Sequence, residues 1–123
     1  MQPPFSSDEM PDVAPDVMPN VMIALTTLPT RDAAAALARH LVDARLAACV
    51  NILPACQSIY RWQGKVEAAD EVLLIIKTSK TQQLALEQLI VNMHPYELPE
   101  LLYVPIAGGL NAYIQWMQQE TLS

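Results

Sequence analysis

The sequence is poor in charged residues, and this shortage narrows the range of functions. Charged side chains make up 16% of its 123 residues, whereas apolar side chains make up 52%. No stretch reaches the roughly 18 apolar residues that a membrane span needs, so we expect no membrane partner. A one-domain chain with this apolar balance favours oligomerisation instead, because obligate subunit interfaces resemble a protein core cut in half.

Basic residues are especially few, since seven Lys and Arg stand against thirteen Asp and Glu, for a net charge of −6. Contacts with phosphates need Lys and Arg, so we expect no nucleic acid partner. Four acids and no base lie in the first twenty residues: Asp8, Glu9, Asp12 and Asp16. This segment also lacks the regions of a signal peptide. We predict a disordered, acidic, Pro-rich tail at residues 1–19, one domain at residues 20–123, and a cytoplasmic location.

Only two cysteines are present, Cys49 and Cys56, which is too few for a disulfide framework. Their spacing matches neither a zinc pair nor a redox motif. The apolar sequence around Cys49 favours a small buried side chain, whereas a functional Cys49 requires a nearby cation or metal. The sequence also lacks a Gly-rich phosphate loop and a nucleophile–base pair. We therefore expect no enzyme, no catalytic residue and no obligatory cofactor.

The apolar pattern of the first half predicts a strand, a helix and a long hairpin. Val21–Leu25 is typical of a buried strand, and Thr30 is a plausible N-cap for the following helix. The apolar positions of that helix are Ala33, Leu37, Leu41 and Ala44. A strand at 47–53 is interrupted near Pro54, resumes at 58–62 and turns at Gln63-Gly64 into a third strand at 65–78. We expect a β-bulge at the interruption.

In the second half, Ser79-x-x-Gln82 fits a capping box and predicts a second helix that stops at His94-Pro95. Leu86, Ile90 and Met93 share one face of it. A fourth strand at 101–106 precedes a terminal helix whose apolar positions are Leu110, Tyr113, Ile114 and Met117. The order β-α-β-β-α-β predicts an α+β, ferredoxin-like sandwich with an extra C-terminal helix.

The segment from His94 to Glu100 combines an imidazole, a phenol and two carboxylates with two prolines that stiffen its backbone. Such a connector is expected where groups converge on a ligand or on a neighbouring subunit. His94 is either a ligand for a metal such as Cu or Zn, or a hydrogen-bonded structural residue. Glu97 and Glu100 serve either acid–base work, or an intersubunit salt bridge or a hydrogen bond to the backbone.

Two other positions allow more than one interpretation. Tyr60-Arg61-Trp62 gives the hairpin the composition of an interface hot spot. In an isolated domain these residues would form an exposed apolar edge, which oligomeric pairing would cover. Lys77, at the end of the third strand, is either a solvated terminus or a cationic member of a cleft.

Several of these motifs, in this order, resemble the CutA divalent-cation-tolerance proteins over about residues 20–120. The motifs are Leu46-Ala47-Ala48-Cys49, Tyr60-x-Trp62-x-Gly64-Lys65, Glu71-Val72 leading to Ile76-Lys77-Thr78, and His94-Pro95-Tyr96-Glu97-x-Pro99-Glu100. The resemblance implies a homotrimer of ferredoxin-like protomers, similar in architecture to PII signalling proteins, whose long hairpins pair with neighbouring subunits. It also implies a link to tolerance of copper and other divalent ions.

In copper-binding members of that family, the ligands are a Cys near the end of the first strand and two consecutive His. The matching positions here are Thr26, Met93 and His94, so only His94 is retained. The resemblance further implies intersubunit clefts for a small ligand or divalent cation, lined by Cys49, Trp62, Glu71, Lys77, Tyr96, Glu97 and Glu100. Two hypotheses follow: a trimer that binds such a ligand in ion homeostasis or signalling, and a trimeric interaction scaffold without a physiological metal.

Overall fold

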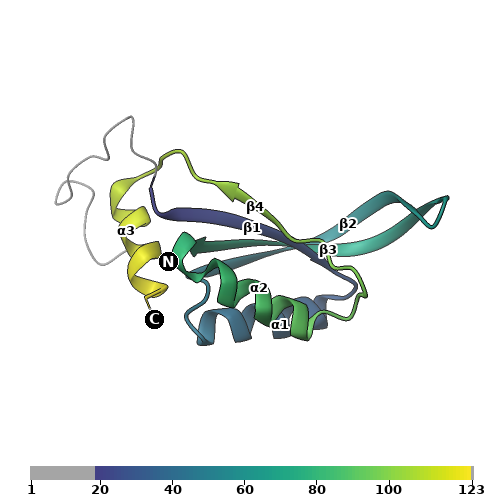
Figure 1. The fold of residues 1–123 in the computed structure, drawn as a ribbon, viewed down its shortest axis with the longest axis horizontal. Coiled ribbons are helices and arrows are strands. Elements are labelled where there is room, and N and C mark those ends of the chain that lie inside the picture. Colours follow the sequence, from purple (N-terminus) through teal and green to yellow (C-terminus); the bar gives the residue numbers. More distant parts are fainter. Residues whose placement is uncertain (1–18, 123) are drawn as a thin grey trace.

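The computed structural model describes residues 19–122, so the acidic part of the predicted tail lies outside the described residues. The elements are β1 (Val21–Leu28), α1 (Arg31–Asp43), β2 (Cys49–Trp62), β3 (Lys65–Ser79), η2 (Lys80–Gln82), α2 (Gln83–Met93), β4 (Leu102–Pro105) and α3 (Asn111–Glu120). The four strands form one antiparallel sheet in the order β2-β3-β1-β4, and α1 and α2 lie along one face of it (Figure 1). The predicted α+β class and element order are confirmed. Within residues 19–122, no helix is both long enough and apolar enough to cross a membrane.

The core lies between the sheet and the two helices α1 and α2. Side chains alternate along each strand, so every second residue faces the helices. A row of registered residues on this face runs across all four strands: Val50, Ile76, Ala24 and Tyr103. The helices meet this face mainly through Leu37 and Leu41 of α1 and Leu86 and Ile90 of α2, each at most 1% exposed.

The start of α1 confirms the predicted cap. The Thr30 hydroxyl accepts a hydrogen bond from the backbone N–H of Ala33 at 3.1 Å. The buried side of the helix differs from the prediction by one position, since Ala34 is buried and Ala33 only partly so. Ala44 is exposed because the helix ends at Asp43.

The predicted capping box at the start of α2 is wrong. Ser79 ends β3 and precedes a short 3₁₀ turn, and its side chain makes no cap hydrogen bond. The Ser79 hydroxyl instead lies 3.0 Å from the hydroxyls of Thr81 and Thr121. Met93 also departs from the prediction, because it is the last residue of α2 and its side chain is 36% exposed.

The β2–β3 hairpin has the predicted bulge and turn. Leu53 pairs with Leu73 and Cys56 with Glu71, so two residues of β2 lie opposite one of β3. Ala55, inside the bulge, has a φ of 60°. The turn residues Gln63 and Gly64 both have positive φ, as type I′ hairpin turns require. Beyond the bulge, the hairpin projects away from the helices (Figure 1).

Helix α3 is fixed at the opposite end of the sheet by side chains that bind its last carbonyl groups. The Arg45 guanidinium donates to the carbonyls of Gln119 at 2.6 Å and Leu122 at 3.1 Å. The Gln82 amide donates to the Thr121 carbonyl at 2.6 Å. These bonds satisfy carbonyls that the end of a helix leaves without intrahelical partners, and they hold α3 against β3.

Candidate functional site

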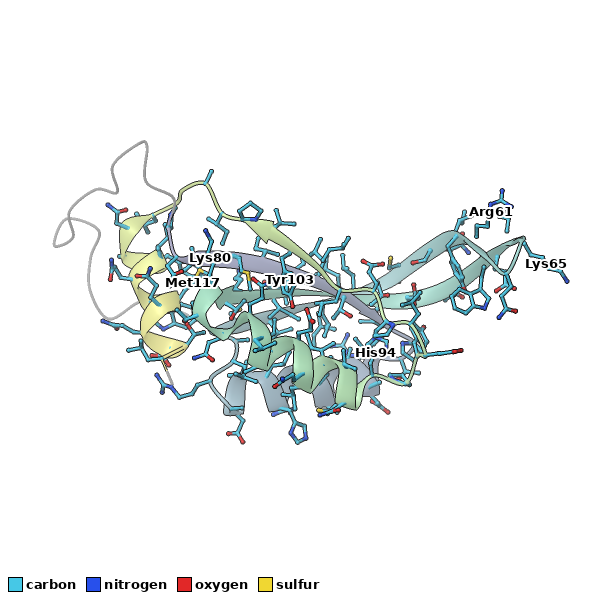
Figure 2. The ribbon with its side chains drawn as sticks, viewed as in Figure 1. Arg61, Lys65, Lys80, His94, Tyr103 and Met117 are labelled. Atoms are coloured by element: carbon cyan, nitrogen blue, oxygen red, sulfur yellow. The ribbon has the colours of Figure 1, made fainter. Side chains whose placement is uncertain are left out.

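His94 lies at the root of the hairpin, buried between the end of β1 and the loop that follows α2 (Figure 2). Its Nδ1 accepts a hydrogen bond from the backbone N–H of Tyr96 at 3.1 Å. Its Nε2 lies 2.7 Å from the carbonyl oxygen of Thr27. Because Nδ1 is an acceptor, the ring proton lies on Nε2, which donates to Thr27. In this geometry both ring nitrogens are occupied, which favours the structural interpretation of His94.

Tyr96 and Glu71 form the second contact of this loop. The Tyr96 hydroxyl donates to Oε2 of Glu71 at 2.8 Å, and Glu71 is only 8% exposed. Burial, followed by the hydrogen bond to the Glu71 carboxylate, raises the pKa of Tyr96 to about 12. A third contact joins the Thr26 hydroxyl to the Glu100 carbonyl at 2.6 Å. These hydrogen bonds therefore hold the loop His94–Glu100 against both β1 and β3.

Replacing Tyr96 with Phe leaves the buried Glu71 carboxylate without its phenol partner. We expect the free energy of unfolding at neutral pH to fall by about 1.5–3 kcal/mol, the usual contribution of a hydrogen bond to a charged group. The phenol pKa is higher in the folded state, so this contribution is complete below the ordinary phenol pKa of 10.0 and is lost as the pH rises through about 12. Urea unfolding of both proteins over this alkaline range should therefore show their stabilities converging.

Tyr60 provides the matched control, because its side chain is 40% exposed. At neutral pH, where both phenols are protonated, the Tyr60→Phe substitution should leave the unfolding free energy within about 0.5 kcal/mol of the wild type. A constant difference between wild type and the Tyr96→Phe variant at all alkaline pH values would contradict the assigned role of the phenol.

The other predicted cleft residues do not join this cluster within one protomer. Trp62 lies at the hairpin tip, opposite Lys65. Cys49 lies opposite Lys77, whose ammonium contacts Tyr113 of α3. Along β3, Glu71 is six residues from Lys65 and six from Lys77, or about 20 Å in each direction. Figure 2 shows the hairpin tip, marked by Lys65, well away from His94.

Glu97 and Glu100 are both exposed, and within residues 19–122 neither carboxylate has a hydrogen bond or an ion pair. No group of three or more His, Cys, Asp or Glu side chains in the same part of the chain is arranged to hold a metal ion. His94 as a metal ligand, and the seven cleft residues as ligand contacts, therefore remain predictions.

Two residues that sequence reasoning did not assign to a site take part in these contacts. Thr27 binds His94 through its backbone carbonyl, an interaction for which side-chain identity gives no signal. Tyr113, predicted only as part of an apolar face, accepts a hydrogen bond from Nζ of Lys77 at 3.3 Å. The amphipathic character of Tyr was the available signal, because its hydroxyl needs a partner when the ring is packed.

A shallow hollow of about 540 Å³ lies elsewhere, between the outer side of α1 and the edge strand β2. Its lining consists of Ala38, Arg39, His40, Val42, Asp43 and Val50. None of the predicted cleft residues lines it, so we do not assign the candidate site there.

Comparison with known proteins gives a consistent result. The family model described as "CutA1 divalent ion tolerance protein" matches residues 22–120. The divalent-cation tolerance protein CutA of Thermus thermophilus is 42% identical over 99 residues, which are 80% of this chain and 96% of that protein. Protein CutA of Homo sapiens is 43% identical over 103 residues, which are 84% of this chain but only 58% of the human protein.

Comparison with solved structures identifies the same family. The Thermus thermophilus protein has a TM-score of 0.82 and 41% identity, covering 83% of this chain and 99% of that one. A protein of Archaeoglobus fulgidus described as periplasmic divalent cation tolerance protein CutA has a TM-score of 0.80 and 32% identity, with the same coverage of 83% and 99%.

Proposed function

The chain belongs to the CutA1 divalent ion tolerance family, and on this premise we propose that it acts as a cytosolic homotrimer. In this proposal the clefts between its subunits bind a small ligand or a divalent cation, and the protein serves ion homeostasis or signalling. One observation carries the proposal: the sheet face that α1 and α2 leave open is apolar.

The open face consists of the strand residues that alternate with those of the core. One registered row across it is Asn51, Ile75, Leu25 and Leu102. Several of its apolar side chains are exposed in the single chain: Leu53 at 38%, Val104 at 43% and Leu102 at 58%. A contiguous apolar face on a soluble domain usually marks an interface. Membership of the CutA1 family favours other copies of this chain as the partners at this interface.

The hairpin supports the same conclusion. Ile59 and Val66, in its projecting half, are 70% and 65% exposed. An isolated two-stranded ribbon is at best marginally stable in water, so this one gains from pairing with another subunit. The sheet edges β2 and β4 offer further unpaired backbone groups for such pairing. The strand order and the crossing helices also support a ferredoxin-like protomer.

The distribution of the predicted cleft residues supports a site built from more than one subunit. Trp62, Glu71 and Lys77 lie at three separate points along one hairpin. A common site for such residues requires contributions from neighbouring copies. A cation at His94 would additionally have to displace the Thr27 carbonyl or the Tyr96 N–H.

A second candidate function is a trimeric interaction scaffold without a physiological metal. The observation that favours it is the internal pairing of the His94–Glu100 loop, where the imidazole and the phenol are already hydrogen-bonded to other parts of the chain. In that case the loop serves to shape the subunit and its interfaces.

Native mass spectrometry of the full chain, with and without Cu(II) or Zn(II), tests both candidates. A trimer that gains three metal ions would support ligand binding repeated by symmetry. A trimer that gains none, with no organic ligand retained, would favour the scaffold. A monomer would overturn both proposals. Fractionation of the source cells tests the cytosolic location separately, and recovery in an exported fraction would contradict it.

A further inference from the structure

We propose that Lys77 and Tyr113 form a binding site for a small organic carboxylate with an apolar or aromatic body. The inference rests on the proposed function, because it names the ligand class of a cleft to which Lys77 is already assigned. It adds α3, through Tyr113 and Trp116, as the element that shapes the site.

Lys77 and Tyr113 have more hydrogen-bond donors than they use with each other, so a bound ligand should supply acceptors. The Lys77 ammonium has three N–H donors and no acceptor. One donor is directed to the Tyr113 oxygen at 3.3 Å. Because that oxygen accepts from Lys77, the Tyr113 hydroxyl proton remains available to another group. The pair therefore presents two further ammonium donors and one phenol donor, which suit the oxygens of a carboxylate.

The surroundings of Lys77 do not neutralise its charge. Lys77 is partly buried, and its registered neighbours on the open face are Cys49, Ile23 and, one strand further, Val104. In the part of the chain that the structure describes, no carboxylate forms an ion pair with it. Glu71, the acid that precedes it on β3, is about 20 Å away. A partly buried cation without a counter-ion favours the binding of an anion.

The basic residues at the end of the sheet next to α3 also favour binding of an anion near Lys77. Lys80 lies on the 3₁₀ turn next to α3 (Figure 2). Arg45 is already engaged with the terminal carbonyls of α3. Glu120 is the acid of α3, and it lies about two turns from Tyr113 along the helix. The basic residues at this end therefore attract an anion towards Lys77.

The aromatic side chains next to Lys77 favour a ligand with an apolar body. The rings of Tyr113 and Trp116 lie 5.3 Å apart at an angle of 41°. Nζ of Lys77 lies 5.5 Å from the centroid of the Tyr113 ring. The carboxylate would meet the ammonium and the phenol, while its apolar body packs against the rings. A single ammonium matches one negative charge, which favours a monocarboxylate over a phosphate dianion.

Benzoate is a suitable probe, and its binding to the full-chain protein can be followed by isothermal titration. We expect binding in the millimolar range or tighter. Lys77→Met should weaken it at least tenfold, Tyr113→Phe several-fold, and Lys77→Arg should retain it. Lys65→Met, at the far end of β3, is the matched control and should bind as the wild type does. Equal binding by wild type and Lys77→Met, or no binding by the wild type, would overturn the proposal.

Two further measurements separate the possible sources of failure. A variant without residues 1–18 tests whether the chain's own acidic segment supplies the carboxylate. If only this variant binds benzoate, that segment is the occupant and the small-ligand proposal is overturned. Native mass spectrometry of the same samples reports the assembly. A trimer that does not bind benzoate refutes this inference alone, whereas a monomer refutes the proposed function.

Discussion

Replacing Ile75 with Glu is expected to convert the proposed trimer to a monomer at micromolar concentration. Ile75 lies near the centre of the open sheet face, between Asn51 on β2 and Leu25 on β1. A trimer built through this face would bury three uncompensated carboxylates, at a cost of several kcal/mol. Since each step of about 1.4 kcal/mol changes an association constant tenfold, assembly should be lost. Sedimentation velocity over a concentration series measures the result.

Val91→Glu is the matched control, because Val91 is 54% exposed on α2 and lies outside the open face. This variant should assemble as the wild type does. Leu102→Glu offers an independent test of the interface, because Leu102 is 58% exposed and a charge there costs the single chain little. Circular dichroism shows whether each monomer is folded. A trimer of Ile75→Glu with the concentration dependence of the wild type would contradict an interface on this face.

The element order could be predicted from the sequence because local chemistry determines it. Pro54 cannot donate to a ladder of hydrogen bonds, and it lies in the bulge between Leu53 and Cys56. Gly64 tolerates positive φ, and the hairpin turns there. The failure of the predicted capping box could not be foreseen from local sequence. The Ser79 hydroxyl binds Thr121, which is 42 residues away, and this tertiary contact replaces the local cap.

The candidate site was only partly predictable, because its key contacts involve backbone atoms and distant residues. The stiffness of the loop after His94 was visible in its prolines. The partners of the His94 ring are the Thr27 carbonyl and the Tyr96 N–H, and neither depends on side-chain identity. Glu71 was placed near Tyr96 only by resemblance to a family, and the phenol–carboxylate hydrogen bond gives that placement a physical reason.

Replacing His94 with Ala should produce the largest loss of stability among the site residues. The substitution removes a donor from the Thr27 carbonyl, whose residue is only 4% exposed, and an acceptor from the Tyr96 N–H. Each buried polar group without a partner costs about 1–3 kcal/mol. The free energy of unfolding should therefore fall by about 2–4 kcal/mol. The bond to His94 Nδ1 should slow hydrogen exchange at the Tyr96 amide in the wild type, and exchange there should become fast in the variant.

His40→Ala is the control for this substitution, since His40 is exposed on α1 and should tolerate the change within about 0.5 kcal/mol. The comparison also separates the two interpretations of His94. A residue that joins β1 to the loop must destabilise the protein when it is removed, even without any metal. If His94→Ala keeps the wild-type stability and Tyr96 protection in metal-free buffer, the structural role is wrong. His94 would then be free for the ligand role that the sequence left open.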